Sequence, residues 1–542
     1  MRAERRSRCS GESSHCRFCG RVFCHACSSM RIDVSEKGSA HPETYRACMA
    51  CYQRDRTSGA ERPEVDVVGE NAILYHTRTL CVPCSITERR GYDPVPAIVV
   101  QRGDTVYLER NCPVHGLLST EYCRSATFFR EAITFAAGVP GDPFDADLDA
   151  LASEIKSNRS SLPLVVELPV TTGSGQLLSK SLVDMRLRKI ENLFPSELSF
   201  ILDIKGGALP SFSHVAQLNA LLLHIEQVTR RCLIIVDLAY DRLIDFAHIP
   251  NSALLKGRIF PGVRYHLVRG EEETAVAELT QLITTMRDFS RIQLIFTLSF
   301  DRPFPSLASV LGLVRQHRDI IKFVVLSPER STRELLATAS KSHMTYDAAG
   351  GSVDPVELID LVCQDVGYGL TRSDFIPASV LQCLEPLLSL MGYGQYSMRI
   401  SSLCGFICPL QFGTGSSITP VARVIDSRRL LKTVSSLSDA LRPRTIPVLA
   451  LNRLRNELLS CTLSGTIMQD ILTSLASIDS GESSSANQRL AEFVSSLQFI
   501  IVDNKMDIAS MDLRRRARCP VATLCVTGST QAFAASSSEG CF

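Results

Sequence analysis

Short apolar runs recur at intervals of roughly 30 residues in the middle of the chain, the size of one strand plus one helix. Each run is continuous rather than alternating, as in parallel strands that are buried on both faces. The segments between them, such as SHVAQLNALLLHIEQV and EETAVAELTQLITTMRDF, carry apolar residues at i, i+3 and i+4, which predicts helices. The predicted strands are LPLVVEL (162–168), LSFILDI (198–204), CLIIVDL (232–238), VRYHLV (263–268), IQLIFTL (292–298) and IIKFVVL (320–326).

Six strand–helix repeats predict an α/β fold, as a partial (β/α)6 barrel or as an open doubly wound sheet. In both arrangements ligands bind at the carboxyl ends of the strands. We place this region at residues 161–375 and treat residues 376–542 as a C-terminal extension.

A second pattern lies before the strand–helix repeats. The runs AIVV and TVYLER surround the turn QRGD, which predicts a β-hairpin. Cys81 and Cys84 precede the hairpin in a C-x-x-C pair, and Cys112 and His115 follow it in a C-x-x-H pair. Two such pairs on a hairpin predict a zinc ribbon, which we place at residues 69–130. The alternative is a hairpin with incidental thiols.

The N-terminus is rich in cysteine pairs. The stretch HCRFCGRVFCHAC holds two C-x-x-C pairs, and YRACMAC holds a third. Paired spacing of this kind favours zinc over a disulfide framework, although some of these cysteines could be plain buried side chains. The six cysteines are Cys16, Cys19, Cys24, Cys27, Cys48 and Cys51.

The motif C-R-x-C-G-x-V-F-C-x-x-C-S followed by R-x-C-x-x-C resembles the FYVE zinc finger, over about residues 9–54 of a module at 1–56. The resemblance implies that Cys16 and Cys19 share one zinc with Cys48 and Cys51. Cys24 and Cys27 would share a second zinc with an earlier pair, of which this sequence holds Cys9 alone. The second site is therefore expected to be incomplete.

FYVE fingers bind phosphatidylinositol 3-phosphate through clustered basic residues, so the resemblance implies headgroup contacts from His15, Arg17 and Arg46. Where the family has R-[RK]-H, this sequence has Glu12, Ser13 and Ser14. We therefore expect weak binding to phosphoinositide membranes, with the endosomal surface as the place where the finger would act.

Composition and charge narrow the classes of protein to which the chain could belong. The 542 residues carry a formal net charge of +1, which gives no global field for nucleic acid. The basic start MRAERRSRCS is not followed by an apolar stretch, and no run of 18 apolar residues occurs. We expect a cytoplasmic chain of several domains without a transmembrane segment.

Three further stretches resemble radical SAM proteins of the tetraether lipid synthase-like group. They are the ribbon, residues 373–426 and the tail NKMDIASMDLRRRARCPVATLCVTG. The resemblance implies a partial barrel that binds an iron–sulfur cluster and S-adenosylmethionine. It also implies a remnant cofactor contact at Gly206 and Gly207, and remnant auxiliary-cluster ligands at Cys404, Cys408 and Cys519.

The chemistry of that family needs C-x-x-x-C-x-x-C after the first strand, because three thiolates hold the cluster. Here the segment that follows the first strand, PVTTGSGQLLSK (169–180), contains no cysteine. Ala208 stands where the family has the acidic residue that ends the second strand. We therefore expect neither cluster nor S-adenosylmethionine, and favour a zinc-binding, non-catalytic adaptor. The alternatives are an active radical SAM enzyme acting on lipid chains, or an enzyme of other chemistry at the barrel mouth.

Overall fold

The computed structural model describes short strands within residues 13–68 and at 534–535. Beyond these it describes, with short gaps, residues 71–86, 94–151, 162–287, 293–328, 354–385, 395–441, 461 and 496–523. The chain divides into two compact units, Met1–Leu74 and Tyr75–Phe542. The first contains the predicted finger, and the second contains most of the predicted ribbon together with the strand–helix repeats.

The first unit contains two small antiparallel hairpins. Strand β1 (Ser13–His15) pairs with β2 (Val22–Cys24), and β3 (Arg31–Val34) pairs with β4 (Glu43–Arg46). The connection between β1 and β2 carries Cys16 and Cys19 in the sequence. Two short hairpins with paired cysteines close by in the sequence agree with the predicted zinc finger.

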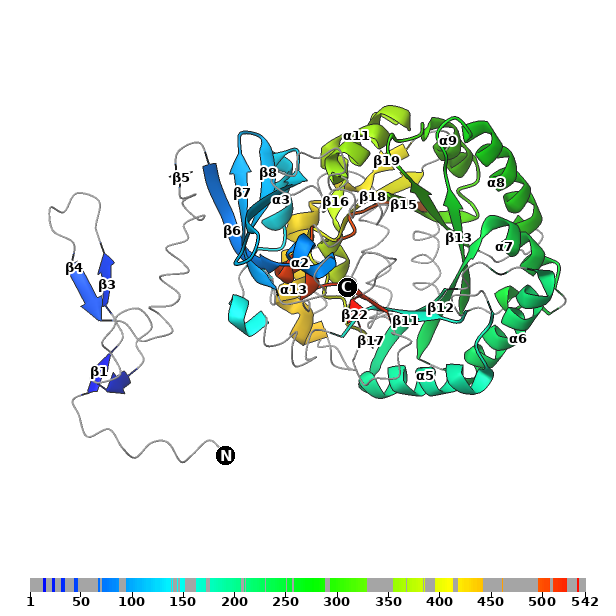
Figure 1. Cartoon of the computed structure of the whole chain (residues 1–542), viewed down its shortest axis with the longest axis horizontal. Helices are drawn as coiled ribbons and strands as arrows, with labels where there is room; N and C mark the ends of the chain where they lie inside the picture. The colour runs from blue at the N-terminus through cyan, green and yellow to red at the C-terminus, as the bar shows by residue number, and fades with distance from the viewer. Residues whose placement is uncertain are drawn as a thin grey trace, which may run out of the picture. The chain divides into compact units, whose positions relative to one another are not determined.

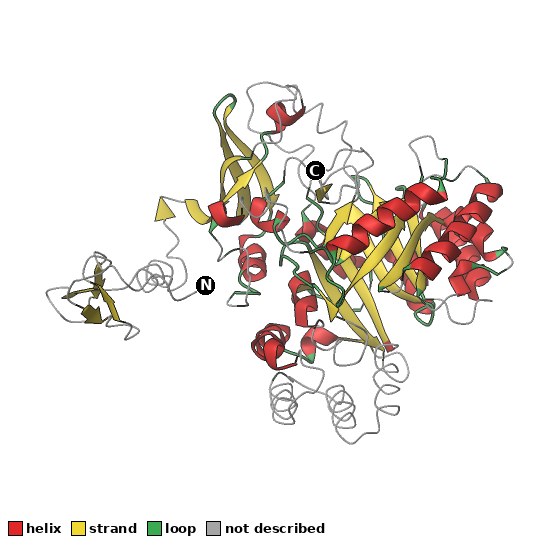
Figure 2. Cartoon of the chain, turned by 90° about the horizontal axis from the view of Figure 1, so that it is seen from below, coloured by secondary structure: helices red, strands yellow, loops and turns green. Residues whose placement is uncertain are grey.

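The predicted ribbon forms a five-stranded sheet, separate from the main sheet (Figure 2). The hairpin around QRGD is confirmed, with Arg102 opposite Thr105 and Gly103 in the left-handed region at φ +59°. Val99, Val106 and Leu108 are fully buried at its centre. The elements are β5 (Val67–Val68), β6 (Asn71–Thr79), α2 (Val82–Ile86), β7 (Val95–Arg102), β8 (Thr105–Cys112), β9 (Gly116–Cys123) and the following helix α3 (Ala126–Ile133).

All six predicted strands of the middle region are present and parallel, in the order of the sequence. Five begin within three residues of the predicted bounds. The fourth begins at Ile259 instead of Val263, because the backbone around Pro261 and Gly262 continues the pairing with the preceding strand. They are β10 (Val165–Pro169), β11 (Leu198–Lys205), β12 (Cys232–Ala239), β13 (Ile259–His266), β14 (Leu294–Phe300) and β15 (Ile321–Pro328).

Helices connect these strands and lie along the outer side of the curved sheet (Figure 1). Both helices expected from the sequence are present, as α6 and α8. Ser179 caps the first helix by accepting a hydrogen bond from the Leu182 N–H. The helices are α5 (Lys180–Leu193), α6 (Phe212–Val228), α7 (Tyr240–Ala247), α8 (Glu272–Arg287), α9 (Ala308–Gln316), α11 (Pro355–Asp365) and, in the extension, α13 (Ser427–Leu441).

The strands are buried more completely on the helix-covered face than on the inner face. In β11, Phe200, Leu202 and Ile204 are buried under the helices, whereas Asp203 and Lys205 are partly exposed. The same alternation occurs in β12. The expectation of strands buried on both faces is therefore wrong in part, because the inner face of a curved, open sheet keeps contact with solvent.

The C-terminal extension adds strands to both sides of the main sheet. Strand β20 (Leu497–Asp503) pairs in parallel with β15, and β18 (Gly405–Phe412) pairs antiparallel with β20. At the opposite side, β21 (Val521–Thr523) pairs with β10. No strand pairing in the described part of the chain joins the two ends of this sheet, so the architecture shown is a mixed α/β sheet that remains open. The remaining short strands are β16 (Ile376–Pro377), β17 (Gln395–Tyr396), β19 (Ile418–Pro420) and β22 (Ala534–Ala535).

Candidate metal centre and the inner face of the sheet

The structure brings together the four ligands predicted in the ribbon. The ligand atoms of Cys81, Cys84, Cys112 and His115 all lie within 4.8 Å of one another. The Sγ atoms of Cys84 and Cys112 are 3.7 Å apart, and the Nδ1 atom of His115 lies 3.5, 3.3 and 3.7 Å from the three sulfurs in sequence order. In a tetrahedral zinc site, two sulfurs are roughly 3.8 Å apart and a sulfur and a nitrogen roughly 3.5 Å apart. The donor set and its dimensions therefore fit zinc, with Nδ1 as the histidine ligand.

Local structure explains why these atoms converge. Cys81 follows β6 with one residue, Leu80, between them, and Cys84 lies in the short helix α2. Cys112 ends β8, and His115 occupies the turn before β9. That turn requires Gly116, whose φ of +71° is in the left-handed region that other residues rarely adopt. The hairpin β8–β9 thus carries Cys112 and His115 and places them beside Cys81 and Cys84, which follow β6.

A buried arginine holds the backbone next to Cys81, the first predicted ligand. Arg110 is 1% exposed and donates hydrogen bonds to the Leu80 carbonyl oxygen at 3.0 Å and to Thr120 Oγ1 at 2.7 Å. Leu80 directly precedes Cys81, so Arg110 fixes the backbone from which the first ligand projects. Such contacts outside the ligand set orient metal ligands and are part of the site.

Burial and backbone N–H donors shift the pKa values of two of the thiols in opposite directions. Burial raises the pKa of Cys81 to about 12. Burial also opposes ionisation of Cys112, but the backbone N–H groups of His115 and Val114 outweigh it and lower its pKa to about 6. Zinc binds thiolates, so binding at this site must release the proton held by Cys81.

The ribbon is joined to the C-terminal segment by a buried polar contact. Asp512 is 0% exposed and accepts hydrogen bonds from Thr77 Oγ1 at 2.6 Å and Tyr75 OH at 2.7 Å, both on β6. It also caps the short helix α17 (Leu513–Arg516) by accepting a hydrogen bond from the Arg514 N–H. One carboxylate therefore connects the metal-binding sheet to the segment that leads into β21.

The finger residues fall largely outside the part of the chain that the structure describes. The backbone of His15 and Cys24 lies on opposite strands of the hairpin β1–β2, and that of Arg46 ends β4. The remaining predicted zinc or headgroup residues of the finger are outside the described residues: Cys16, Arg17, Cys19, Cys27, Cys48 and Cys51.

The cysteines of the predicted remnant cluster have different surroundings. Burial raises the pKa of Cys519 to about 12, with Cys404 as a further neighbour that raises it. Burial also raises the pKa of Cys408, whose neighbours are Asp374, Cys363 and Arg423 instead. Among the described residues, the ribbon ligands are the one Cys/His/Asp/Glu group compact enough for a metal ion. Gly206 and Gly207 lie outside the described residues.

Sequence reasoning missed a charged cluster on the inner face, at the carboxyl ends of the parallel strands. Lys205 Nζ lies 2.6 Å from Asp203 Oδ2 and 2.8 Å from Asp237 Oδ2. Asp237 Oδ2 also accepts a hydrogen bond from Arg264 at 2.7 Å, and Glu167 Oε1 lies 3.8 Å from Lys205. The signal in the sequence was the single acid inside each of the apolar runs VVEL, ILDI and IIVDL. Strand register then places Glu167 beside Asp203, and Lys205 beside Asp237.

The two aspartates of this cluster have opposite pKa shifts. Burial raises the pKa of Asp203 to about 6, against the attraction of Lys205. Burial also opposes ionisation of Asp237, but Lys205 and Arg264 outweigh it and lower its pKa. Asp203 thus destabilises the fold when it ionises, and Asp237 stabilises it.

We expect Asp203→Asn to change the pH dependence of stability in a defined direction. The pKa of Asp203 is about 6 in the folded chain, whereas in the unfolded chain it returns to its ordinary value of 3.8. Relative to the variant, the wild-type chain should therefore lose up to about 3 kcal/mol of unfolding free energy between pH 4 and pH 7. Urea unfolding across this pH range measures the difference.

Asp237→Asn provides the matched control with the opposite sign. Because the pKa of Asp237 is lowered, its contribution is present at neutral pH and is lost as the pH falls. The wild-type chain should therefore gain stability relative to this variant as the pH rises. If the stability of both variants changed with pH in the same direction relative to wild type, the two aspartates would not have the opposite pKa shifts described.

Comparisons with known proteins agree with both metal-binding predictions. The FYVE zinc finger family matches residues 7–57, and the HMPTM N-terminal zinc ribbon domain matches residues 73–124, which include all four converging ligands. A search of curated proteins finds no match to this chain. Within the described residues, no helix is both long and apolar enough to cross a membrane. The chain carries a FYVE zinc finger followed by a zinc ribbon, and the ribbon holds a Cys/His set suited to metal binding.

Proposed function

We propose that this chain is a zinc-dependent, non-catalytic adaptor that binds phosphoinositide membranes weakly through its finger. The observation that carries the proposal is the FYVE match over residues 7–57, beside a ribbon whose four ligands converge. In this proposal the α/β region is a degenerate radical-SAM-like body that the ribbon and the C-terminal segment hold together. The chain would act in the cytoplasm and at endosomal membranes.

Two features support a body without catalysis. The sequence between β10 and α5 contains no cysteine, so this loop has no thiolates for a cluster. Burial alone would lower the pKa of Lys205, but Asp203 and Asp237 outweigh it and raise the pKa above its ordinary value. A lysine that remains protonated at neutral pH is neither a nucleophile nor a general base. The inner-face charges are largely engaged with one another, as in a structural network.

The basic residues of the finger set the expected strength of lipid binding. Arg17, Arg46 and His15 are the available headgroup donors by resemblance to the family. A charge-assisted hydrogen bond contributes about 1.5–3 kcal/mol. Two or three of them give an affinity on the order of millimolar once association costs are subtracted. Salt weakens binding that depends on ion pairs of this kind.

We expect the full chain to sediment with liposomes containing phosphatidylinositol 3-phosphate at low ionic strength and not at about 150 mM salt. Arg17→Ala and Arg46→Ala should abolish the low-salt signal. Arg188→Ala, a change on the exposed face of α5, is the control and should have no effect.

Two results would contradict the proposal in different ways. Headgroup-specific sedimentation at physiological salt that Arg17→Ala abolishes would show that the finger binds the phosphoinositide headgroup strongly. Low-salt sedimentation that is equal for liposomes with and without the phosphoinositide would show that the finger does not recognise the headgroup.

A further inference from the structure

The turn between β8 and β9, at the metal-binding end of the ribbon, is apolar and open to solvent; residues 113–118 are called the ribbon tip. Val114 and Leu117 are 54% and 67% exposed, the two highest values among the large apolar side chains of the described residues. They flank the predicted ligand His115. A Cβ atom placed on Gly116 would meet no atom within 4 Å, so this side of the turn is open as well. Apolar side chains gathered at one exposed turn indicate a contact surface.

The ribbon tip is held in a fixed shape. Cys112 and His115, which enclose Val114 in the sequence, both belong to the metal-ligand group. The Val114 N–H donates to Cys112 Sγ at 3.4 Å, and strand pairing joins Cys112 to Gly116 across the turn. A turn fixed in this way loses little conformational entropy when its side chains are buried against a partner.

The ribbon tip carries no ionic side chain. The segment NCPVHGLLST (111–120) contains no Asp, Glu, Lys or Arg. Three thiolates and a neutral imidazole around zinc have one net negative charge. The buried guanidinium of Arg110, which donates to the Leu80 carbonyl oxygen next to Cys81, offsets that charge. The tip therefore has no carboxylate that an anionic lipid surface would repel, and it can leave water at low cost.

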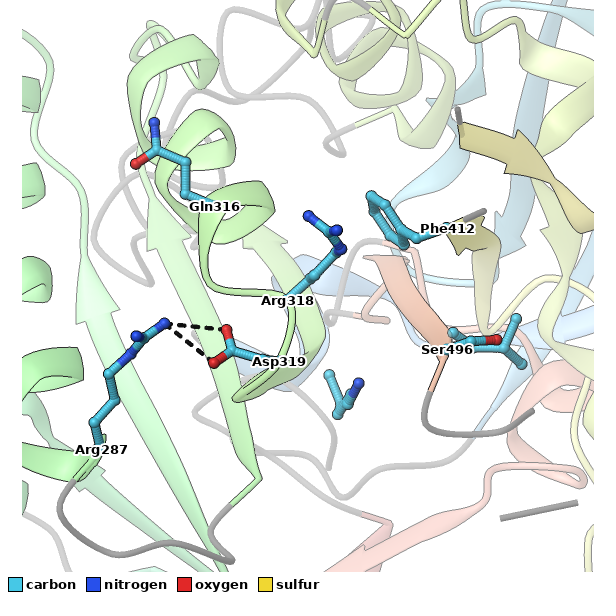
Figure 3. A pocket seen from close by; sticks show the side chains of 8 residues that line it. Arg287, Gln316, Arg318, Asp319, Phe412 and Ser496 are labelled. Carbon is cyan, nitrogen blue, oxygen red and sulfur yellow. Dashed lines mark hydrogen bonds and ion pairs between the residues drawn. The ribbon is translucent and has the colours of Figure 1, made fainter. Parts of the chain in front are cut away.

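A cavity elsewhere in the second unit has the opposite character. Its volume is about 430 Å³, it lies where β15 and β20 begin, and its lining includes Arg287, Arg318, Asp319 and Lys322. Arg287 NH2 lies 3.1 and 3.2 Å from the two carboxylate oxygens of Asp319 (Figure 3), and Asp319 also attracts Lys322. Charges that pair with one another in this way favour a structural role, so the ribbon tip is the stronger candidate for a contact surface.

We infer that the ribbon tip inserts Val114 and Leu117 into the interface of an anionic lipid membrane. The inference rests on the proposed function, in which the finger brings the chain to the membrane. Two exposed side chains on a protruding turn fall far below the roughly 800 Å² that each partner of a stable protein complex contributes. A bilayer closes around a protruding turn without a matching groove, and the gain grows with the apolar area that is buried.

A second weak contact on the same chain strengthens the first. Once the finger has bound, the tip meets the membrane at a high effective concentration, so the two contacts act together. Transfer of two half-exposed aliphatic side chains out of water should raise the affinity at least about tenfold. Apolar insertion also differs from headgroup recognition in one measurable respect, because salt screens ion pairs and not apolar contacts.

Tryptophan fluorescence tests the insertion directly, because the chain contains no Trp. The full zinc-loaded chain carrying Leu117→Trp and a hexahistidine tag is bound to phosphatidylcholine–phosphatidylserine vesicles that contain a nickel-chelating lipid. The tag holds the chain at the membrane whether or not the finger binds. The emission should shift to shorter wavelength and be quenched by brominated acyl chains, equally at low salt and at about 150 mM salt.

A matched control has its tryptophan on another exposed apolar position of the same unit. Val228 is 45% exposed at the end of α6, away from the ribbon (Figure 1), and Val228→Trp should show neither the shift nor the quenching. In untagged chains, Leu117→Asp and Val114→Asp should each weaken low-salt sedimentation with phosphatidylinositol 3-phosphate liposomes at least about tenfold. Val228→Asp should sediment as wild type does, and metal analysis should find zinc in all three variants.

The outcomes separate this inference from the proposed function. Unshifted, unquenched emission of Leu117→Trp on the tethered vesicles would overturn the inference, whatever the finger does. A change in the oligomeric state of Leu117→Asp, with membrane binding intact, would also overturn it, because the tip would then be a protein contact. Insertion on tethered vesicles without sedimentation on phosphoinositide liposomes would support the inference and contradict the role proposed for the finger.

Discussion

Removing zinc from the purified chain should unfold the ribbon and lower the stability of the whole second unit. A structural zinc ion contributes about 10–16 kcal/mol in small zinc modules, which is comparable to the total stability of a domain. The ribbon has a small core of its own, and its sheet is tied to the C-terminal segment through Asp512. Loss of the metal should therefore remove more β-structure than the ribbon alone contains. Circular dichroism before and after chelation, with metal analysis of the starting protein, measures this.

Substitution of single ligands should reproduce the effect of chelation. Cys84→Ser and Cys112→Ser each remove one of the four donors, and we expect loss of bound zinc together with a large fall in the melting temperature. Cys123→Ser is the matched control, because Cys123 is a buried cysteine at the end of β9 that donates to the Ser125 carbonyl oxygen and belongs to no ligand group. It should retain zinc and lose about 1 kcal/mol. Less than one zinc per chain in folded protein would contradict the metal centre.

Asp512→Ala should destabilise the second unit by about 3–5 kcal/mol. The wild-type carboxylate is fully buried and accepts hydrogen bonds from Tyr75, Thr77 and the Arg514 N–H. Hydrogen bonds to a charged group contribute about 1.5–3 kcal/mol each, and the alanine variant leaves buried hydroxyl groups without an acceptor. Thermal and urea unfolding of the zinc-loaded chain measure the loss.

An exposed ion pair provides the comparison for Asp512. Asp149 accepts from Arg78 at 2.7 Å, but its side chain is 84% exposed. Asp149→Ala should therefore cost at most about 1 kcal/mol. If the two variants were equally stable, the buried carboxylate would not be what holds the ribbon to the C-terminal segment.

Local patterns predicted the elements that depend on neighbouring residues. The apolar runs from LPLVVEL to IIKFVVL predicted six strands, because a parallel strand packed under helices is mostly apolar even where its inner face carries a charge. The C-x-x-C and C-x-x-H spacings gave the ribbon ligands, because metal geometry restricts the sequence near each ligand. The resemblance to FYVE fingers agrees with the family match.

Elements that depend on distant residues could not be predicted in the same way. Strand β20 pairs with β15 across a separation of more than 160 residues, and Thr77 meets Asp512 across 435. No periodicity in the sequence encodes which distant segment fills the edge of a sheet. The bounds of β13 were also misplaced, because Pro261 and Gly262 are typical of a turn but here continue the pairing with β12.

The sequence by itself determined the two metal-binding modules and the repeated strand–helix order, since both follow from the spacing of side chains along a short segment. Tertiary structure alone decided the open edges of the sheet, the inner-face cluster of Glu167, Asp203, Lys205, Asp237 and Arg264, and the cavity beside Lys322. These charges lie on several different strands, so their meeting depends on strand register and sheet curvature. Register is fixed by the packing of the whole core, which no local pattern contains.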